Sequence, residues 1–496
     1  MKNYIKSIAL SAFCLTSVAL TGCEDFLTED PQSNYFTESF YKQESDFEYA
    51  IAGVYAQQQG LYGYSGGACR LPITRADEVK VGAGYTDNND KFIDDGSGSY
   101  IPAYWNGLYT MINRANSILQ TIDEVEFRNA TNKNSIKGEA LALRAWAYYN
   151  LGINFGGVPL IDVMIDNTGV LNETKKIARS TQAETLAFAA KDYKAAIELL
   201  PEAWTGKGLG RVTKYAAIGG LARLYMFEGN FSSAAPLLKS IIDSGKYAMA
   251  KNYVDCFDDA FDNTEERVWE VQFMSGGLGE GNTFPASFFP EGYNKAEYNI
   301  PGSSAFMDVS SDFVNAYEEG DLRKDVTLIA DITVGSSVRE GWYVHKWLHN
   351  TAVPVNHDDY AINWPILRYT DVIMMYAECL NEAGYAADGE AFKLINSVRE
   401  RAGLAPLTAA TTPDQAAFRK AIMQERRVEF AFEGLRWWDL VRWDTALEVM
   451  DKFLSLPENE NGKYKMGSND RKIYAIPTTE IDRYGDTSVM WQNPGY

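Results

Sequence analysis

The stretch NSIKGEALALRAWAYYNLGINF, residues 134–155, decides the fold of this chain. Its apolar residues cover nearly the whole circumference of a helix. A helix that is apolar on almost every side is buried among other helices. Two glycines and a proline follow at once, at Gly156, Gly157 and Pro159, and predict where this helix ends. The stretch therefore predicts a mainly α protein with this helix inside it.

Two pairs of segments further along the chain have the pattern of helical hairpins. The first pair is residues 213–227 and 231–243, and the second is residues 367–382 and 390–402. Small residues within 216–222 allow a partner helix to approach closely. Helix pairs of this length predict tetratricopeptide-type units, although unrelated helical hairpins would look similar.

The rest of the chain divides into helical and irregular parts. Helical periodicity places a scaffold at about residues 45–60, 105–245 and 365–450. The loop-rich region, at about residues 60–104 and 250–364, lacks sustained periodicity except for a strand-like alternation at residues 267–273. Long irregular segments in compact domains are usually functional. We expect a single domain over residues 23–496 whose loop-rich inserted region carries the ligand site.

Residues 1–22 have the pattern of a signal peptide that is removed on export. Lys2 and Lys6 precede an uncharged apolar run, and small residues stand in front of Cys23. The run is too short to cross a bilayer as a helix. The tetrapeptide Leu-Thr-Gly-Cys resembles the bacterial lipobox, in which the cysteine is lipidated, and the alternative is an ordinary signal peptide. We predict lipidation of Cys23, and two or more acyl chains are enough for stable anchoring.

Charge and cysteine content narrow the function further. The net charge of -21 argues against nucleic acid, whose phosphates need a basic surface. It also argues against binding to anionic lipid, so the acyl chains would be the anchor. Cys69, Cys256 and Cys379 form neither a disulfide framework nor a CxxC metal motif. We expect them to behave as small apolar residues, with one disulfide among them left open.

Four stretches, in chain order, resemble one protein family. They are CEDFL at 23–27, GEALALRAWAYY at 138–149 with FGGVPL at 155–160, ERRVEFAFEGLRWWDLVRW at 425–443, and QNPGY at 492–496. Together they resemble the SusD/RagB family of outer-membrane nutrient-binding lipoproteins of Bacteroidetes. The last two stretches are the most specific, and the likeness covers essentially the whole mature chain.

This resemblance implies a location, a partner and a function. Proteins of that family lie on the outer face of the outer membrane and act as the lid of a SusC-type TonB-dependent transporter. They bind oligosaccharides or, in RagB-like members, peptides, and they are not enzymes. Their fold is a tetratricopeptide scaffold with long insertions that carry the ligand site. Glu24 and Asp25 also look like the surface-export signal of such lipoproteins.

One set of carboxylates has a spacing that would also suit catalysis, so an enzymatic function is considered as an alternative. Glu425, Glu429 and Glu433 are four residues apart and would share a helix face. Glycoside hydrolases use such paired carboxylates. However, interleaved charged residues at helical spacings favour structural ion pairs; these are Arg426, Arg427, Arg436, Asp439 and Arg442. We therefore expect no catalytic residue, and keep a surface glycoside hydrolase as the alternative from another class.

No metal site or cofactor is expected. His345, His349 and His357 lie close together in sequence, but no HExxH motif is present, and a surface loop is the favoured interpretation. Acidic clusters at 87–96 and 255–263 do not have the spacing of an EF-hand loop. Adventitious calcium remains an alternative at these clusters.

Residues of the loop-rich region that could bind a sugar are the better functional signal. An aromatic plane covers the apolar face of a sugar ring, while polar side chains bond to its hydroxyls. The candidates are Arg75, Asp77, Tyr85, Asn88, Tyr100, Phe288, Tyr293 and Trp342. Any one of these rings could instead pack a loop onto the scaffold. We expect capture of an oligosaccharide whose identity the sequence does not reveal.

Overall fold

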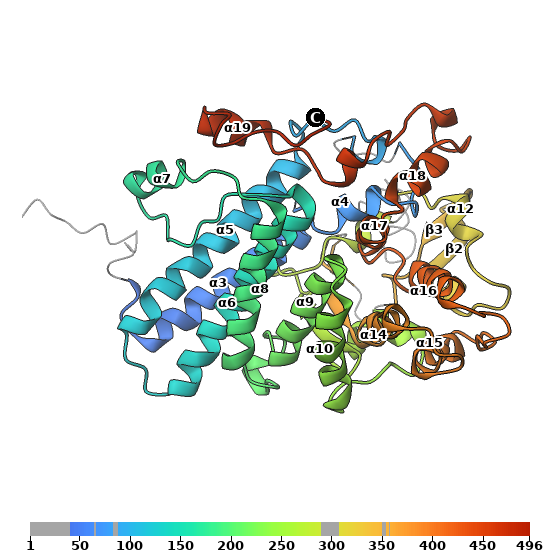
Figure 1. The fold of residues 1–496 in the computed structure, drawn as a ribbon, viewed down its shortest axis with the longest axis horizontal. Helices are drawn as coiled ribbons and strands as arrows, with labels where there is room; N and C mark the ends of the chain where they lie inside the picture. The colour runs from blue at the N-terminus through green and yellow to red at the C-terminus, as the bar shows by residue number, and fades with distance from the viewer. Residues whose placement is uncertain (1–39, 64–65, 83–87, 289–306, 350–353, 357) are drawn as a thin grey trace, which may run out of the picture.

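The computed structural model describes residues 40–63, 66–82, 88–288, 307–349, 354–356 and 358–496 (Figure 1). The predicted mainly α fold is confirmed. The helices are α3 (Glu44–Tyr62), α4 (Arg70–Thr74), α5 (Tyr100–Thr121), α6 (Ala130–Phe155), α7 (Thr168–Thr174), α8 (Gln182–Leu199), α9 (Lys214–Phe227), α10 (Phe231–Asp243), α12 (Ser311–Val314), α13 (Arg323–Thr327), α14 (Tyr369–Ala383), α15 (Glu390–Arg401), α16 (Gln415–Glu429), α17 (Arg436–Arg442), α18 (Ala446–Leu454) and α19 (Thr478–Tyr484).

Helix α6 lies inside the helical array, as its sequence predicts. It packs against α3, α5, α8 and α9, and almost every residue from Ser135 to Phe155 is buried. The side chain of Asn129 caps its first turn by accepting hydrogen bonds from two backbone N–H groups. At its other end the chain turns at Gly156, with φ of 77°. A Cβ atom on Gly157 would lie 1.7 Å from the carbonyl oxygen of Ser180, so only glycine fits there.

The helices form a continuous array of neighbours. In sequence order α3 packs against α5, then α6, α8, α9, α10, α14 and α15, each helix contacting the next. Figure 1 shows this array running across the molecule. Both predicted hairpins are present, as α9 with α10 and α14 with α15. Because α10 also packs against α14, the two pairs stack, as tetratricopeptide-type units do.

Two small antiparallel sheets lie within the loop-rich region. Strand β1 (Arg267–Val271) falls where the sequence predicts a strand and pairs with β4 (Trp364–Arg368). Strands β2 (Leu328–Val334) and β3 (Ser337–Val344) form a hairpin that the sequence analysis did not predict. Most of its exposed positions are polar, so it looks like a solvated loop in sequence. Among the described residues, no helix is both long and apolar enough to span a bilayer.

Candidate functional site

Three segments of the loop-rich region meet at one place, here called the loop junction: residues 78–82, 308–310 and 342–344. Val79 and Val309 form an antiparallel bridge. The Lys80 N–H donates to the Asp308 carbonyl at 2.8 Å. The Val309 N–H donates to the carbonyl of Trp342 at 3.4 Å. The structure thus brings parts of two candidate segments, 60–104 and the one that contains Trp342, together through residues 308–310, although more than 200 residues separate 78–82 from 308–310 in sequence.

Two of the predicted binding residues lie at the protein surface. Trp342, in β3, is half-buried, and the ammonium of Lys324 lies 5.0 Å from the centre of its ring. Asn88 is exposed and has the left-handed backbone conformation, with φ of 61°. A ring and an amide of this kind are the groups that bind a sugar face and its hydroxyls. Tyr85, Tyr293 and Cys23 lie outside the described residues.

Arg75 and Asp77 are buried and paired within the protein. Arg75 is fully buried, and its guanidinium lies 2.8 Å from Asp94. Asp77 lies 2.8 Å from Arg436 and 2.9 Å from Arg427. Burial alone would raise the pKa of Asp77, but these two guanidinium groups outweigh it and hold the pKa well below its ordinary value. Both side chains are therefore occupied by partners within the protein instead of facing a ligand.

Tyr100 and Phe288 are also buried. Tyr100 belongs to the first turn of α5 instead of the preceding loop, and its hydroxyl accepts a hydrogen bond of 2.9 Å from Arg70. The ring of Phe288 packs against Phe284 and Phe432, with centroids 4.7 and 5.9 Å away. A ligand at the surface does not reach either side chain in this structure. For both rings the packing alternative describes the structure.

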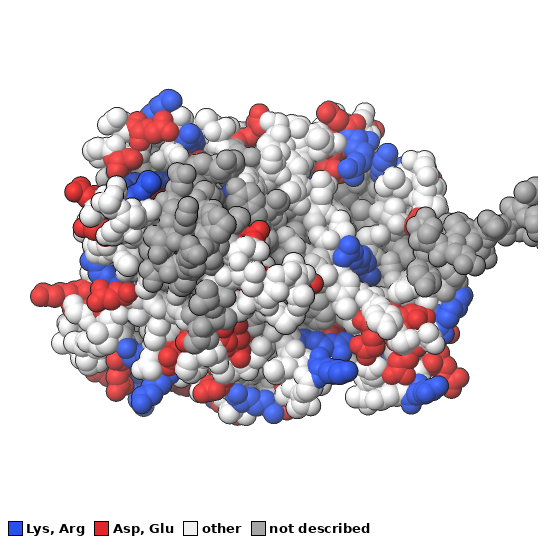
Figure 2. Space-filling view, turned by 180° about the vertical axis from the view of Figure 1, so that it is seen from behind, with Lys and Arg blue, Asp and Glu red and all other residues white. Residues whose placement is uncertain are grey.

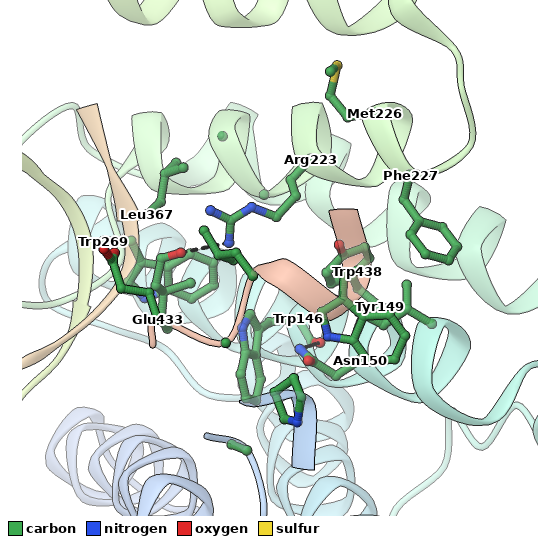
Figure 3. Close-up of a pocket in the computed structure, with 18 of the residues that line it drawn as sticks. Trp146, Tyr149, Asn150, Arg223, Met226, Phe227, Trp269, Leu367, Glu433 and Trp438 are labelled. Atoms are coloured by element: carbon green, nitrogen blue, oxygen red, sulfur yellow. Dashed lines mark hydrogen bonds between the residues drawn. The ribbon is translucent and has the colours of Figure 1, made fainter. Parts of the chain in front are cut away.

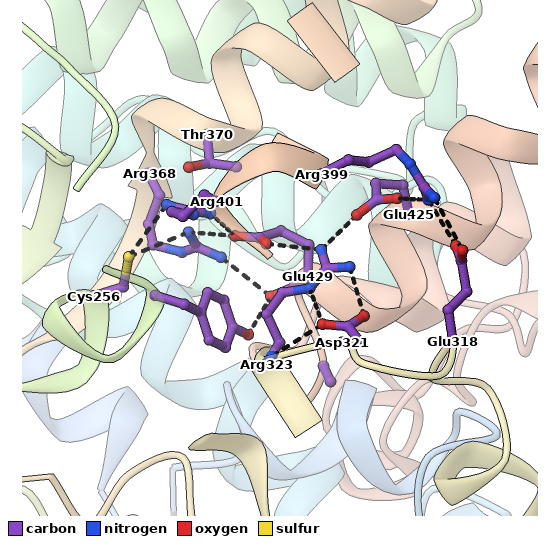
Figure 4. A network of polar contacts seen from close by, with 12 residues as sticks. Cys256, Glu318, Asp321, Arg323, Arg368, Thr370, Arg399, Arg401, Glu425 and Glu429 are labelled. Carbon is purple, nitrogen blue, oxygen red and sulfur yellow. Dashed lines mark hydrogen bonds and ion pairs between the residues drawn. The ribbon is translucent and has the colours of Figure 1, made fainter. Parts of the chain in front are cut away.

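Glu429 lies at the centre of a buried network of ion pairs (Figure 4). Its carboxylate lies 2.6 Å from Arg401 and 3.0 Å from Arg368. Arg323 approaches its other oxygen at 3.2 Å. Burial alone would raise the pKa of this carboxyl, but the surrounding guanidinium groups outweigh it and hold the pKa well below its ordinary value. Glu429 is therefore ionised and fully paired at neutral pH, unlike a general acid.

The other two carboxylates of the predicted stripe are paired as well. Glu425 lies 3.0 Å from Arg399, and Glu433 lies 2.7 Å from Lys346. All three glutamates are buried. The prediction that ion pairs occupy these carboxylates is confirmed, and no pair of them is open to a glycosidic bond in this structure.

Two details of that prediction were wrong. Helix α16 ends at Glu429, and Phe432 turns the chain with φ of 58°, so Glu433 is not on the same helix face. The partners of the glutamates also come from other segments of the chain. The interleaved Arg426 pairs with Asp371 at 2.6 Å and with the interleaved Asp439 at 2.8 Å. Asp439 also pairs with Arg442 at 2.8 Å. Sequence spacing reveals only pairs along one helix, such as Asp439 with Arg442, whereas the partners of the glutamates are tertiary.

A cavity lined by aromatic rings lies between α6, α9, α17 and β4 (Figure 3). Its aromatic lining is Tyr62, Tyr104, Trp146, Tyr149, Tyr193, Phe227, Trp269, Trp364 and Trp438. The cavity has a volume of about 90 Å³, enough for several water molecules. Arg223 projects into the cavity and donates a hydrogen bond of 2.6 Å to the carbonyl of Ile366. The sequence analysis missed this cavity because Trp146 and Tyr149 lie on helix α6, where apolar residues indicate core.

The cysteines and histidines form no additional site among the described residues. Cys69, Cys256 and Cys379 are buried free thiols, and burial raises the pKa of Cys256 to about 12. His345 and His349 stack edge to face, with ring centroids 4.7 Å apart. Within the described ranges, no three His, Cys, Asp or Glu side chains are grouped closely enough to hold a metal ion. On the face shown in Figure 2, acidic and basic side chains are interspersed over the described surface.

Two family models match most of the chain between them. The model described as "SusD family" matches residues 330–496. The model described as "Starch-binding associating with outer membrane" matches residues 25–226. The first range contains both of the sequence stretches that carry the most specific resemblance.

Relatives and solved structures agree with these matches. SusD-like protein P25 of Formosa agariphila is 28% identical over 493 residues, covering 90% of this chain and 91% of that protein. A structure of surface glycan-binding protein A from Bacteroides thetaiotaomicron has a TM-score of 0.77 at 21% identity, covering 92% of this chain and 100% of that one. A laminarin-binding SusD-like protein has a TM-score of 0.75 at 24% identity, with the same coverage. The family matches begin at residue 25 and end at residue 496, and this chain belongs to the SusD/RagB family.

Proposed function

We propose that this protein binds an oligosaccharide at the cell surface and delivers it to a SusC-type TonB-dependent transporter in the outer membrane. The observation that carries this proposal is the loop junction, which joins residues 78–82 and 308–310 to the end of strand β3, where the half-buried Trp342 lies. Two neighbours in fold support a saccharide as the ligand. One is the laminarin-binding SusD-like protein, and the other is surface glycan-binding protein A in complex with laminarihexaose.

The groups beneath the loop junction fix its shape before a ligand arrives. The Ser310 hydroxyl donates to the carbonyl of Asp77 at 3.0 Å, and the Asp77 carboxylate is held by Arg436. The Ser310 N–H donates to the Glu78 carbonyl at 3.0 Å. A surface ordered in advance loses less conformational entropy on binding. Trp342 would then cover the apolar face of a sugar.

The mechanism is binding and release, without a covalent step. Glu425, Glu429 and Glu433 supply no acid or base, because each is buried against cationic partners. The hydrolase alternative therefore has no carboxylate pair in this cluster to support it. Peptide capture, as in RagB-like members, is the alternative within the binding class, since aromatic rings and amides also bind peptides.

Calorimetry tests the ligand class directly. The full chain, purified in detergent, is titrated with laminarihexaose, other neutral oligosaccharides and a peptide mixture. We expect saturable heat with at least one oligosaccharide and no new reducing ends. Binding to peptides alone would contradict the proposal, and release of reducing ends by the wild-type protein would favour the hydrolase.

We also propose that Cys23 is lipidated and that the lipid holds the protein on the outer face of the outer membrane. Cys23→Ala should release the protein from the membrane fraction. Surface proteolysis of intact cells tests the outward orientation, and co-purification with a TonB-dependent barrel tests the partner. Retention of Cys23→Ala in the membrane would contradict the anchor, whereas the saccharide titration would be unaffected.

A further inference from the structure

A second hollow with the groups needed to bind a sugar lies away from the loop junction. It lies between strand β1 and residues 202–213, which connect α8 to α9, and has a volume of about 480 Å³. We call it the Trp204 groove; its main lining residues are Trp204, Arg211, Tyr247, Arg267, Trp269 and Glu270. It shares no lining residue with the loop junction. Its volume is in the range of ligand pockets, which is about 300–1,000 Å³.

The ring of Trp204 is held in place at the edge of this groove. Its indole N–H donates 2.8 Å to the carbonyl of Val212, and the guanidinium of Arg211 lies 4.5 Å from the ring centre. Gly208 packs so closely that a Cβ atom there would lie 2.6 Å from the ring. The ring is nevertheless only partly buried. A fixed, part-exposed aromatic plane is suited to the apolar face of a sugar, because little ordering is needed on binding.

The floor of the groove contains buried polar atoms with unused hydrogen-bonding capacity. Arg267 is buried, and its guanidinium lies 3.1 Å from Glu270 and 3.5 Å from Asp262. Among the described residues, however, none of its N–H groups finds a hydrogen-bond acceptor in suitable geometry. In the same described part of the chain, the Trp269 indole N–H also finds no acceptor, and the Glu270 Oε1 atom finds no donor in suitable geometry. Buried groups of this kind normally have a partner, which is a water or a ligand when the protein supplies none.

The mixture of donors, acceptors and charges selects the class of ligand. The Trp269 indole N–H has no acceptor among the described residues, and the Arg267 guanidinium faces Glu270 at 3.1 Å without a well-aligned hydrogen bond. A hydroxyl both donates and accepts, so it matches donor and acceptor groups that lie side by side. The charges lining the groove balance, with Glu202, Glu265 and Glu270 against Arg211, Lys246 and Arg267. This balance favours a neutral ligand over an anion or a cation.

We propose that the Trp204 groove is a second saccharide-binding site that takes neutral sugar units against the ring of Trp204. This site goes beyond the capture surface proposed at the loop junction and does not depend on it. Two sites on one chain would let a long glycan stay bound at one while it moves at the other. The affinity for a multivalent glycan would then exceed that of either site alone.

Titration of three full-length proteins tests this proposal. Wild type, Trp204→Ala and Trp342→Ala are titrated with laminarihexaose, maltohexaose, xylohexaose and mannohexaose, and unchanged melting temperatures establish that the variants fold. We expect wild type to bind two saccharides per chain and each variant to lose about tenfold in affinity at one of them. Saturating saccharide should also protect Trp204 of wild type from oxidation, as measured by mass spectrometry, which tests the groove even if Trp204→Ala does not fold.

The outcomes separate the two sites. Equal stoichiometry and affinity in wild type and Trp204→Ala, with no protection of Trp204, would overturn the groove and leave the loop junction standing. A single site that Trp204→Ala loses and Trp342→Ala keeps would establish the groove and overturn the loop junction as the capture site. Binding of no saccharide by wild type would overturn both.

Discussion

Arg75 donates a hydrogen bond of 3.0 Å to the hydroxyl of Tyr496, the last residue of the chain. The same guanidinium pairs with Asp94 at 2.8 Å. Figure 1 shows the C-terminal segment returning to end near α4, which Arg75 follows directly. Asn493 extends this link by donating 3.0 Å to the carbonyl of Phe155, at the end of α6. The closing QNPGY stretch therefore fastens the C-terminus to both the loop-rich region and the buried helix.

Tyr496→Phe should lower the free energy of unfolding by about 1 kcal/mol, because it leaves one buried N–H group of Arg75 without its acceptor. Urea denaturation measures this change. Tyr49→Phe is the matched control, since Tyr49 is 71% exposed and should give no measurable change. Equal effects of the two substitutions would contradict a stabilising role for the Arg75–Tyr496 bond.

Glu429→Gln should destabilise the protein by about 3–5 kcal/mol, because it leaves Arg401, Arg368 and Arg323 buried without their shared counter-charge. Thermal unfolding at pH 7 measures the loss. Asp243→Asn is the control, since its pair with Lys239 is exposed and such pairs contribute less than about 1 kcal/mol. A Glu429→Gln protein as stable as wild type would show that the network does not depend on this charge.

Trp342→Ala should weaken oligosaccharide binding by about tenfold, because it removes the ring proposed to cover the sugar face. Calorimetric titration of the glycan that wild type binds measures the change. Trp491→Ala serves as the control, because Trp491 is 41% exposed and lies outside the loop junction. If both variants bind like wild type, the loop junction is not the capture surface.

Glu78→Gln should become more stabilising as the pH rises from about 5 to about 8. Burial, with the nearby charge of Asp77, raises the pKa of Glu78 to about 8, against about 4.3 in an unfolded chain. The folded protein therefore binds the proton of Glu78 more tightly than the unfolded chain does. Wild type loses the stability that this proton provides as the pH rises from the lower pKa to the higher one. Glutamine does not ionise. Its side-chain oxygen still accepts the hydrogen bond that the Phe432 N–H donates to Glu78 in wild type.

Melting temperatures at several pH values test this prediction. The difference between Glu78→Gln and wild type should grow steadily with pH. The control is Glu319→Gln, at an exposed site. The difference in melting temperature between this variant and wild type should stay constant with pH. A Glu78→Gln protein whose advantage shrinks as the pH rises would refute the burial of a protonated carboxyl.

Gly157→Ala should destabilise the protein by about 1–3 kcal/mol or more, because the new methyl group would collide with the backbone of Ser180. Gly53→Ala in α3 should have the opposite sign, since nothing lies within 4 Å of its added Cβ atom. Alanine in a helix is favoured over glycine by about 0.5–1 kcal/mol. Chemical denaturation measures the change in the free energy of unfolding for each variant. A change of the same sign in both variants would contradict the packing at Gly157.

The helical scaffold could be predicted from the sequence because helical periodicity is a local property. The segments 213–227 and 231–243 agree with α9 and α10 to within one residue. Apolar residues on nearly every side of its sequence predict that helix α6 is buried. The family could be recognised for a related reason: its most specific stretch, residues 425–443, holds the charged side chains that build the interior network.

The exposure of the candidate binding residues was decided only by the tertiary structure. Arg75 and Asp77 lie in a polar, glycine-rich segment that looks solvated, yet both are buried against charges contributed from other parts of the chain. Trp342 remained at the surface, although nothing in its local sequence distinguishes it from the buried Trp347. The sequence by itself determined the main helices and the family. Which polar groups face a ligand depended on contacts between distant segments, because a charge can be buried only where the fold supplies its partner.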